Sequence, residues 1–356
     1  MNKLTKVGCS ALCGSLAAIS AASAGDMTVT GGADMTWLSK NGATSGNPLG
    51  IGSNFNIKGS GELDNGWTFD VTTAFTNVGA YSAANITLDL GGLGKFNFNQ
   101  GNSGNGIAAY DDKMPTAWEE SWGAGLSGGV ITVLGSGASQ NVMYTSPTLL
   151  GTTITATYAH EYGASDVADK GTKSADNETA RSYDGTININ PSLGTEILSG
   201  LNIFAGASTI KTVEDSGIAG DAYQGVGGVT YSLGPLSLGY QVSGDYTGYD
   251  AIQSAGTDTG KWNYYQNFAY GVAFNVNDGL SVSYGKWEAK KAGYSDTSVN
   301  IVDESLRTVV VDSIQAAYTM GGATISIAEI NVDNQSYSTA ATADLDATVI
   351  SLGLAF

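Results

Sequence analysis

The sequence feature that most constrains the fold is a two-residue period of apolar and polar side chains. In segment 27–37, apolar or small residues occupy the odd positions, and Thr28, Thr30 and Asp34 stand between them. Segments 67–75 and 236–242 repeat this pattern. Because successive side chains of a strand point to opposite faces, each segment predicts a strand with one apolar and one polar face.

The breaks between these segments alternate in length. Seven short breaks carry turn residues, at 64–66, 91–92, 146–151, 190–200, 234–235, 277–279 and 321–322. Eight longer polar stretches lie between them, at 39–50, 77–83, 101–139, 160–181, 211–221, 247–261, 290–306 and 333–346. Short turns at one end, long loops at the other and an even strand count are typical of outer-membrane barrels. We therefore expect an all-β transmembrane antiparallel β-barrel of about 16 strands, with short periplasmic turns and long extracellular loops.

The first 24 residues are predicted to be a cleaved signal peptide. Two lysines precede an apolar stretch at 7–19, and the small residues 22–24 form a cleavage site. Both cysteines lie in this segment, so residues 25–356 contain none. Without its two lysines the chain keeps 13 basic residues against 33 acidic ones, a net charge of −20. This charge argues against nucleic acid as a partner.

Composition restricts the membrane arrangement further. Only 13% of the residues are charged, and the chain has 50 glycines and 18 tyrosines. After the signal peptide, no apolar run reaches the ~20 residues that a spanning helix needs. The chain is therefore expected to cross the membrane with strands. A secreted β-rich adhesin or surface protein without a pore remains the alternative.

Three segments carry a family resemblance. The last strand has alternating residues Thr348, Ile350, Leu352, Leu354 and Phe356, and it resembles the assembly signal of outer-membrane barrels. Segment 141–158 is similar to the strand, turn and strand after the third loop of general porins of the alphaproteobacterial type, and 27–32 resembles their first strand. The resemblance implies a general diffusion porin in the cell outer membrane of a Gram-negative bacterium. It also implies a homotrimer in outer-membrane lipid, folded by the barrel assembly machinery.

The strand count predicts the function, because a barrel of sixteen strands leaves an aqueous channel. Passive diffusion of ions and small hydrophilic solutes is therefore expected. The polar strand faces are predicted to line the lumen. The candidate wall residues are Lys58, Asp70, Asp89, Arg181 and Arg307.

The longest loop, 101–139, is the third by position, and in general porins the third loop folds inward. It carries the candidate constriction residues Asp111, Asp112, Glu119 and Glu120. Carboxylates in a narrow, low-dielectric passage concentrate cations, so a cation preference is expected. The alternative is a solvated loop whose tryptophans pack on the barrel rim. Related porins oppose this loop with a basic cluster, for which Lys58 is the best wall candidate here.

No catalytic constellation occurs in the sequence, so an enzyme is not expected. The only histidine, His160, has no nucleophile motif nearby. No cofactor is predicted, although Asp111 and Asp112 leave open a structural calcium site.

One strand conflicts with the pattern. Alternation from Ile314 and Tyr318 puts Asp312 on the outer, lipid-facing side. A β-bulge near Asp312, or burial against a neighbouring subunit, would resolve the conflict. The small residues at 225–227 and 31–33 are candidates for close subunit contact.

Overall fold

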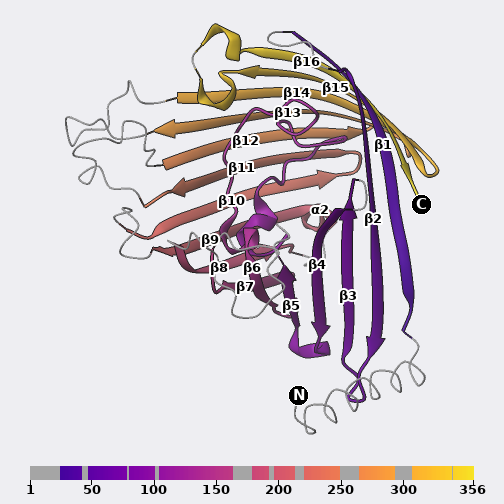
Figure 1. Ribbon diagram of the computed structural model, residues 1–356, viewed down its shortest axis with the longest axis vertical. Helices are drawn as coiled ribbons and strands as arrows, with labels where there is room; N and C mark the ends of the chain where they lie inside the picture. Colours follow the sequence, from indigo (N-terminus) through magenta and orange to yellow (C-terminus); the bar gives the residue numbers. More distant parts are fainter. Residues whose placement is uncertain are drawn as a thin grey trace, which may run out of the picture.

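The computed structural model describes residues 25–41, 47–77, 80–100, 104–162, 179–191, 196–212, 220–248, 264–292, 307–338 and 340–356. Within these residues, sixteen antiparallel strands form a closed barrel in which each strand pairs with the next and β16 pairs with β1 (Figure 1). The predicted fold class and strand number are confirmed. The predicted signal peptide, 1–24, lies outside the described residues.

The strands have the following bounds. The first eight are β1 (Met27–Asn41), β2 (Leu49–Glu62), β3 (Thr68–Thr76), β4 (Ala80–Asp89), β5 (Lys95–Gln100), β6 (Gln140–Thr145), β7 (Thr152–Ala159) and β8 (Thr179–Ile189). The second eight are β9 (Leu201–Thr212), β10 (Ala222–Leu233), β11 (Leu236–Tyr246), β12 (Tyr264–Asn275), β13 (Leu280–Ala292), β14 (Arg307–Met320), β15 (Ala323–Asp333) and β16 (Leu345–Ala355). Short helical turns accompany them: η1 (Gly91–Leu93), η2 (Gly106–Tyr110), η3 (Gly135–Ala138), α2 (Glu196–Ser199), η6 (Gln335–Tyr337) and η7 (Ala341–Ala343).

The predicted turns all fall between strands. In the turn between β12 and β13, the Asn277 side chain accepts hydrogen bonds from the backbone N–H groups of Gly279 (2.9 Å) and Leu280 (3.0 Å). Gly66, with φ of 82°, adopts the left-handed conformation that glycine tolerates best. Several predicted loops are shorter in the structure, and β1 and β2 both extend into 39–50. Of the stretch 77–83, residues from Ala80 onward belong to β4, which pairs with β3 across a register shift.

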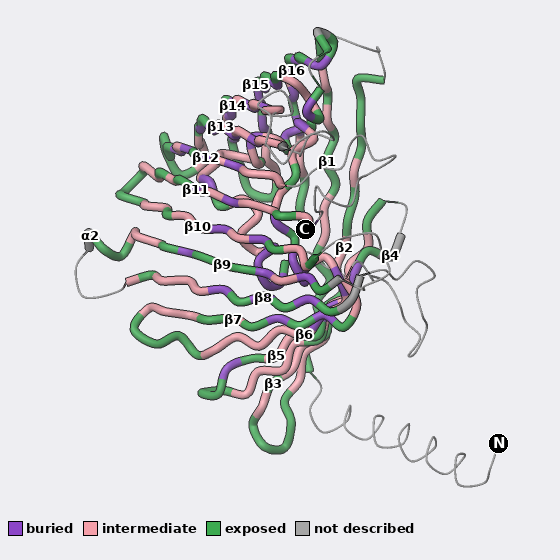
Figure 2. Tube along the Cα trace, turned by 90° about the vertical axis from the view of Figure 1, so that its left-hand side faces the viewer, coloured by how far each residue is buried: buried purple, intermediate pink, exposed green. Residues whose placement is uncertain are grey.

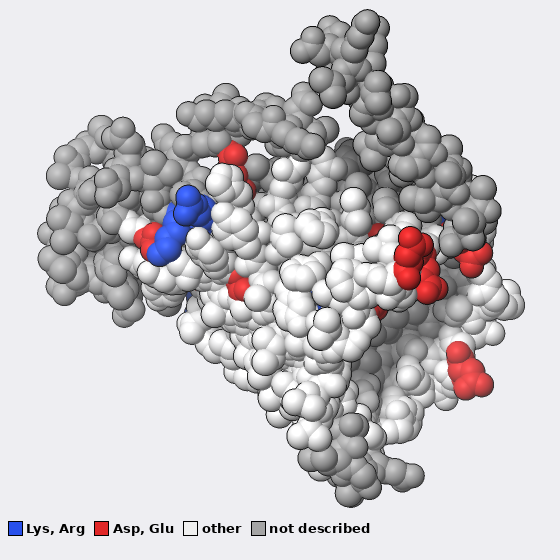
Figure 3. Space-filling view, turned by 90° about the horizontal axis from the view of Figure 1, so that it is seen from below, with Lys and Arg blue, Asp and Glu red and all other residues white. Residues whose placement is uncertain are grey.

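The two faces of the barrel differ as the alternation predicts. On β11, Tyr240 stands opposite Tyr270 of β12 on the outer face. The neighbouring Gln241 points inward and is 1% exposed. Aromatic side chains of β3, β11 and β12 lie on the outer face. On β3, Phe75 pairs with Phe55 of β2, and their rings stack at 4.7 Å. In Figure 3, most of the visible surface carries neither acidic nor basic side chains.

The most buried residues lie inside the barrel. Figure 2 shows buried stretches on the strands from β8 to β16 and on the chain that crosses the interior. Trp287, Val309 and Val311 on the inner face are at most 1% exposed and pack in one cluster with Leu126 of segment 101–139. Among the described residues, no helix is long and apolar enough to cross a membrane.

The barrel closes between the first and last strands. The backbone N–H of Gly31 donates to the carbonyl oxygen of Phe356 (3.1 Å), and the N–H of Phe356 donates back to Gly31 (2.9 Å). The chain end is therefore part of the ladder that joins β16 to β1.

Candidate functional site

The described part of segment 101–139, residues 104–139, runs along the inner wall of the barrel. It leaves β5, follows the wall as far as β16, where Ala124 and Leu126 share a buried cluster with Val349, and returns to β6. At its start, the Asn105 side chain donates to Asn97 (2.9 Å) and Asn141 (2.7 Å). These contacts place the segment inside the barrel, which argues against the rim-loop alternative.

Asp184 on β8 fixes both ends of the inner segment. Its carboxylate accepts from the backbone N–H of Ile107 (3.1 Å) near the start. It also accepts from the backbone N–H of Ser136 (3.0 Å) and the Ser136 hydroxyl (2.9 Å) near the end. Asp184 is 5% exposed, so these donors compensate its lost hydration.

Glutamines on the wall hold the middle of the segment. Gln241 on β11 accepts from the Lys113 N–H (3.1 Å) and donates to the carbonyl oxygens of Tyr110 (3.0 Å) and Asp111 (2.9 Å). On β10, Gln224 accepts from Gly135 (2.7 Å). An amide side chain both donates and accepts, so it satisfies loop backbone groups that have no strand partner.

Aromatic packing adds to these hydrogen bonds. The Tyr110 ring stacks on Phe204 of β9 at 5.1 Å, and Trp122 meets Trp287 of β13 edge to face at 6.0 Å. From the last loop, the Tyr337 hydroxyl accepts from the backbone N–H of Ile131 (3.1 Å). The inner segment is therefore attached along its whole described length.

The four predicted constriction carboxylates form two adjacent pairs on this segment. Asp111 and Asp112 follow η2. The Asp111 carboxylate accepts from the backbone N–H of Asp112 (2.9 Å), and the Asp112 carboxylate accepts from the backbone N–H of Met114 (2.7 Å). Glu119 and Glu120 lie beside β14. The wall glutamines thus hold the backbone of each pair: Gln241 contacts the first pair, and Gln315 on β14 contacts the second.

Burial changes the protonation of these carboxylates. It raises the pKa of Asp112 to about 7, and the charges of Glu120 and Asp111 add to the effect. Burial also raises the pKa of Glu119 to about 7, assisted by a hydrogen bond from Glu120 and by the charges of Glu120 and Asp34. The pKa of Asp111 is raised by the same loss of hydration. Asp34 points inward from β1, so the wall adds a carboxylate of its own to the field at Glu119.

The predicted wall residues of β2 to β4 point into the lumen, but they are paired. The Lys58 ammonium lies 3.3 Å from the Asp70 carboxylate, and Lys95 lies 2.9 Å from Asp89. Lys58 is therefore half of an ion pair and does not act as an unopposed positive charge.

The two arginines occupy different places. Arg307 begins β14 and shares the inner face of Val309, at the loop end of the strand. Arg181 is exposed and lies at the register shift between Thr179 and Ser182, also at a loop end. Arg181 is therefore a rim residue, contrary to its predicted position on the lumen wall.

Among the described residues, no group of three or more His, Cys, Asp or Glu side chains is placed to hold a metal ion. Calcium binding at Asp111 and Asp112 stays a prediction.

The residues that anchor the inner segment were not predicted from the sequence. Asp184, Gln224, Gln241 and Gln315 all sit at inward positions of their strands. Their placement could have predicted an anchoring role, because a large amide or carboxylate on an inner face needs a hydrogen-bond partner.

The comparisons with known proteins agree with this architecture. The sequence matches the profile of the Gram-negative porin family over residues 8–304. Among solved structures, OmpF of Salmonella typhi in complex with daunomycin has 13% identity and a TM-score of 0.66, over 93% of this chain and 98% of that one. The anion-selective porin of Comamonas acidovorans has 14% identity and a TM-score of 0.62, over 93% and 99%.

A third structure, the outer membrane channel DcaP of Acinetobacter baumannii, has 12% identity and a TM-score of 0.62, over 94% of this chain and 98% of that one. At these identities the likeness shows a shared fold. No curated protein matches the sequence.

Proposed function

The chain belongs to the Gram-negative porin family and forms an outer-membrane diffusion channel, and on this premise we propose that the channel prefers cations. The proposed filter is the set of four carboxylates Asp111, Asp112, Glu119 and Glu120, which we call the filter carboxylates. The secreted-adhesin alternative does not fit a closed barrel of this family.

One observation carries the proposal: the filter carboxylates lie on a chain segment that is held inside the barrel. Because Asp184, Gln241 and Gln315 fix that segment to the wall, the negative charges keep their place in the water path. A fixed carboxylate in a narrow passage raises the local cation concentration and lowers that of anions.

The charges on the barrel wall also favour a cation preference. Lys58 and Lys95 are each within 3.3 Å of a carboxylate, so their positive charges are locally compensated. Asp34 adds a further negative charge close to Glu119. On the segment itself, Lys113 is the one basic residue beside the four filter carboxylates, so the proposed field at the filter is net negative. The Comamonas porin is described as anion-selective, so we assign selectivity to the charges of each chain and not to the shared fold.

The proposed permeants are ions and small hydrophilic solutes that diffuse passively. We assign the filter carboxylates an electrostatic role and no catalytic one, so the protein acts as a channel and not as an enzyme. The carboxylates of Asp111 and Asp112 accept hydrogen bonds from backbone N–H groups of the same segment.

We further propose that the channel assembles as a homotrimer in outer-membrane lipid after folding by the barrel assembly machinery. Most side chains on the outer strand faces are apolar and suit lipid. Phe356 ends the last strand with an exposed ring, which leaves it available as an assembly signal.

Purified protein in a planar bilayer tests the proposal. Stepwise conductance is expected. In a salt gradient, the reversal potential should have the sign expected when cations carry most of the current. An anion-selective reversal potential would overturn the cation preference, and absence of steps would overturn the channel itself.

A further inference from the structure

The inner segment folds back on itself inside the barrel. Its outgoing limb, residues 106–120, carries the filter carboxylates and meets the wall at Gln241 of β11 and Gln315 of β14. Its return limb, residues 126–136, comes back past β12, where the Asn267 side chain donates to its backbone (2.9 Å). The two limbs are one continuous chain, so movement of the return limb pulls on the limb that carries the filter.

The return limb lies nearer the loop end of the barrel than the outgoing limb does. On β11, Gln241 contacts the outgoing limb. Ser243, two residues closer to the loop end, accepts a hydrogen bond (3.1 Å) from the same Asn267 amide that contacts the return limb. The return limb is therefore the part of the inner segment that a loop at the barrel mouth can reach.

The loop between β15 and β16 contacts the return limb at two successive carbonyl groups. The Gln335 side chain donates to the carbonyl oxygen of Ser127 (2.6 Å). The backbone N–H of Ser336 donates to the carbonyl oxygen of Gly128 (2.9 Å). We call residues 335–337 of this loop the clasp. Among the described residues, every hydrogen bond that these two carbonyl groups accept from outside the segment comes from the clasp.

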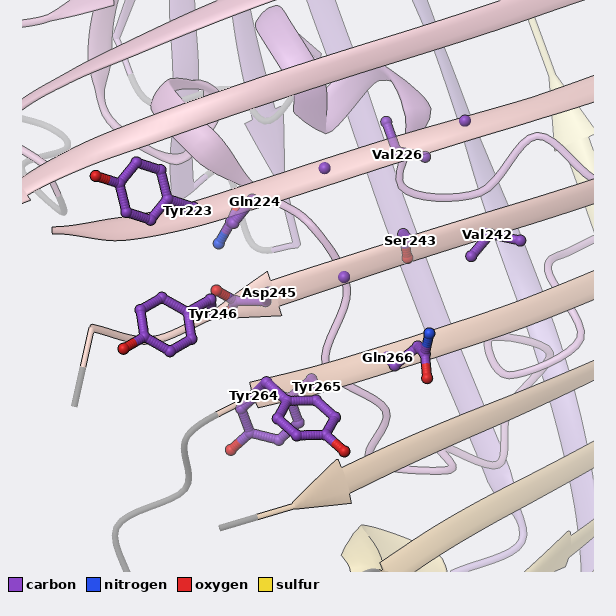
Figure 4. Close-up of a pocket in the computed structure, with 13 residues that line it drawn as sticks. Tyr223, Gln224, Val226, Val242, Ser243, Asp245, Tyr246, Tyr264, Tyr265 and Gln266 are labelled. Carbon is purple, nitrogen blue, oxygen red and sulfur yellow. The ribbon is translucent and has the colours of Figure 1, made fainter. Parts of the chain in front are cut away.

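Tyr337 is the third residue of the clasp, and it is buried. Its hydroxyl accepts from the backbone N–H of Ile131, and only 7% of the residue is exposed. Its ring packs at 5.7 Å against the ring of Tyr265, which Figure 4 shows near the loop end of β12. The Lys291 ammonium of β13 lies 5.3 Å from the centre of the Tyr337 ring, within cation–π range. The clasp thus ties the return limb to β12 and β13.

The chain that the clasp holds has little stiffness of its own. Four of the seven residues from 123 to 129 are glycine. Gly125 and Gly129 have φ of 97° and 67°. Glycine has the greatest backbone freedom of all residues, so such a stretch needs outside contacts to keep one conformation. The inner-wall cluster supplies apolar contacts through Leu126, and the clasp supplies hydrogen bonds.

Backbone strain shows that the clasp is held in a defined conformation. Asn334, Ser336 and Tyr337 have φ of 56°, 55° and 63°, in the left-handed region that residues with side chains rarely adopt. Such conformations persist where surrounding contacts impose them, and they concentrate at functional sites. Here the Asn334 N–H donates to the Asp344 carboxylate (2.9 Å), and its side chain donates to the carbonyl oxygen of Thr308 (3.0 Å). The strain is thus maintained in the loop that holds the return limb.

We propose that Gln335 and Tyr337 are positioning residues of the channel. From the loop end of the barrel, they hold the return limb against the wall and keep it out of the water path. Without the clasp, the glycine-rich chain 123–129 enters the water path for short times, and the conductance falls while it is there. The inference rests on the channel itself and not on its cation preference, because cations and anions share the obstructed path.

Single-channel recording in symmetrical salt tests the proposal with the variant Gln335→Met/Tyr337→Phe. Both changes keep the size of the side chain and remove its hydrogen bond to the return limb. Brief closures to a lower conductance should become about tenfold more frequent, because two bonds that oppose the displacement are lost. The fully open conductance and the thermal unfolding of the barrel should stay as in the wild type. Closures as rare as in the wild type would overturn the proposal.

Tyr144→Phe/Asn277→Leu is the matched control. It removes a tyrosine hydroxyl bond to the Leu93 carbonyl oxygen (2.8 Å) and a side-chain amide bond from the Gly279 N–H (2.9 Å), both at periplasmic turns. Its closures should be as rare as in the wild type. Equally frequent closures in the control and the test variant would overturn the assignment to the clasp. A wild-type protein without conductance steps would instead contradict the channel, so the two failures are distinguishable.

A reversible disulfide restores the contact in the test variant. Residues 25–356 contain no cysteine, and a Cβ at Gly129 would lie 3.1 Å from the Ser336 Cβ. Gly129→Cys/Ser336→Cys, added to Gln335→Met/Tyr337→Phe, therefore brings two thiols within bonding reach after a small shift. The positive φ of Gly129 strains a cysteine there, so the oxidised protein is compared with the same protein after reduction.

The oxidised channel should be fully open with few closures, and the reduced channel should close often. A disulfide that lowers the open conductance, or that leaves the closures as frequent as in the reduced protein, would overturn the proposal. Failure of the disulfide to form would also overturn it, because the clasp would then not lie against the return limb.

Discussion

The side chain of Gln315 on β14 holds the backbone of Glu119 from both sides. Its Oε1 accepts from the Glu119 N–H at 3.0 Å, and its Nε2 donates to the Glu119 carbonyl oxygen at 2.8 Å. A side-chain amide thus reproduces the two hydrogen bonds that a neighbouring strand would make. The backbone of Glu119 is therefore fixed to the wall, which limits the region that its carboxylate can reach.

Gln315→Leu should loosen this part of the inner segment. The variant removes the bonds to Glu119 and one from the Trp118 N–H (3.2 Å), each worth about 1 kcal/mol net. Single-channel recordings are expected to show more current noise and a weaker cation preference. Thr319→Val, near the exposed turn end of the same strand, is the control. A quiet channel with wild-type selectivity would refute the anchoring role.

The cation preference should depend on pH near neutrality. Asp112 and Glu119 have pKa values raised to about 7 by burial, so both are charged above that pH and neutral below it. The reversal potential should therefore shift toward zero as the pH falls from about 8 to about 6, whereas ordinary carboxylates would stay charged over this range. In Asp112→Asn/Glu119→Gln the profile should be flat. A wild-type profile that is equally flat would show that these two groups do not titrate there.

The ion pair between Lys58 and Asp70 should tune selectivity in opposite directions. Asp70→Asn leaves Lys58 uncompensated on the lumen wall and should weaken the cation preference. Lys58→Met leaves the carboxylate uncompensated and should strengthen it. Both side chains are partly exposed, so a modest change is expected. Reversal potentials of the two variants that move in the same direction would contradict this account.

Phe356 should matter for assembly more than for stability. Its ring is 79% exposed, whereas its backbone pairs with Gly31. Phe356→Ala keeps that backbone pairing, so purified variant should refold in detergent with nearly wild-type thermal stability. In cells, the amount in the outer membrane should fall several-fold. Wild-type levels in cells would mean that the ring is not the recognised feature.

The strands and turns were predictable because their signals are local. Alternation in 236–242 determines which face of β11 is apolar, and turn chemistry at 277–279 determines where β12 ends. The stretch 77–83 failed because its small and polar residues resemble a loop. The structure pairs Ala80, Tyr81 and Ala83 with β3 by backbone hydrogen bonds, which depend little on side-chain type.

The site was predictable only in part. The filter carboxylates stood out because acidic residues gather in the longest loop. Their anchors did not, because Asp184 lies 77 residues from Ile107 and Gln315 lies 196 from Glu119. To predict the ion pair between Lys58 and Asp70, the register of β2 against β3 must be known. The alternation within one strand does not give that register.

The most direct measurement is the reversal potential in a salt gradient at about pH 8 for a channel without its filter charges. The test variant is Asp111→Asn/Asp112→Asn/Glu119→Gln/Glu120→Gln. The control removes the same number of negative charges at turns and outer strand ends, with Asn replacing Asp64, Asp278, Asp333 and Asp346. The account predicts a cation-selective potential in the wild type and the control, and one near zero in the test variant. A test variant as cation-selective as the wild type would contradict the assignment of the filter to segment 101–139.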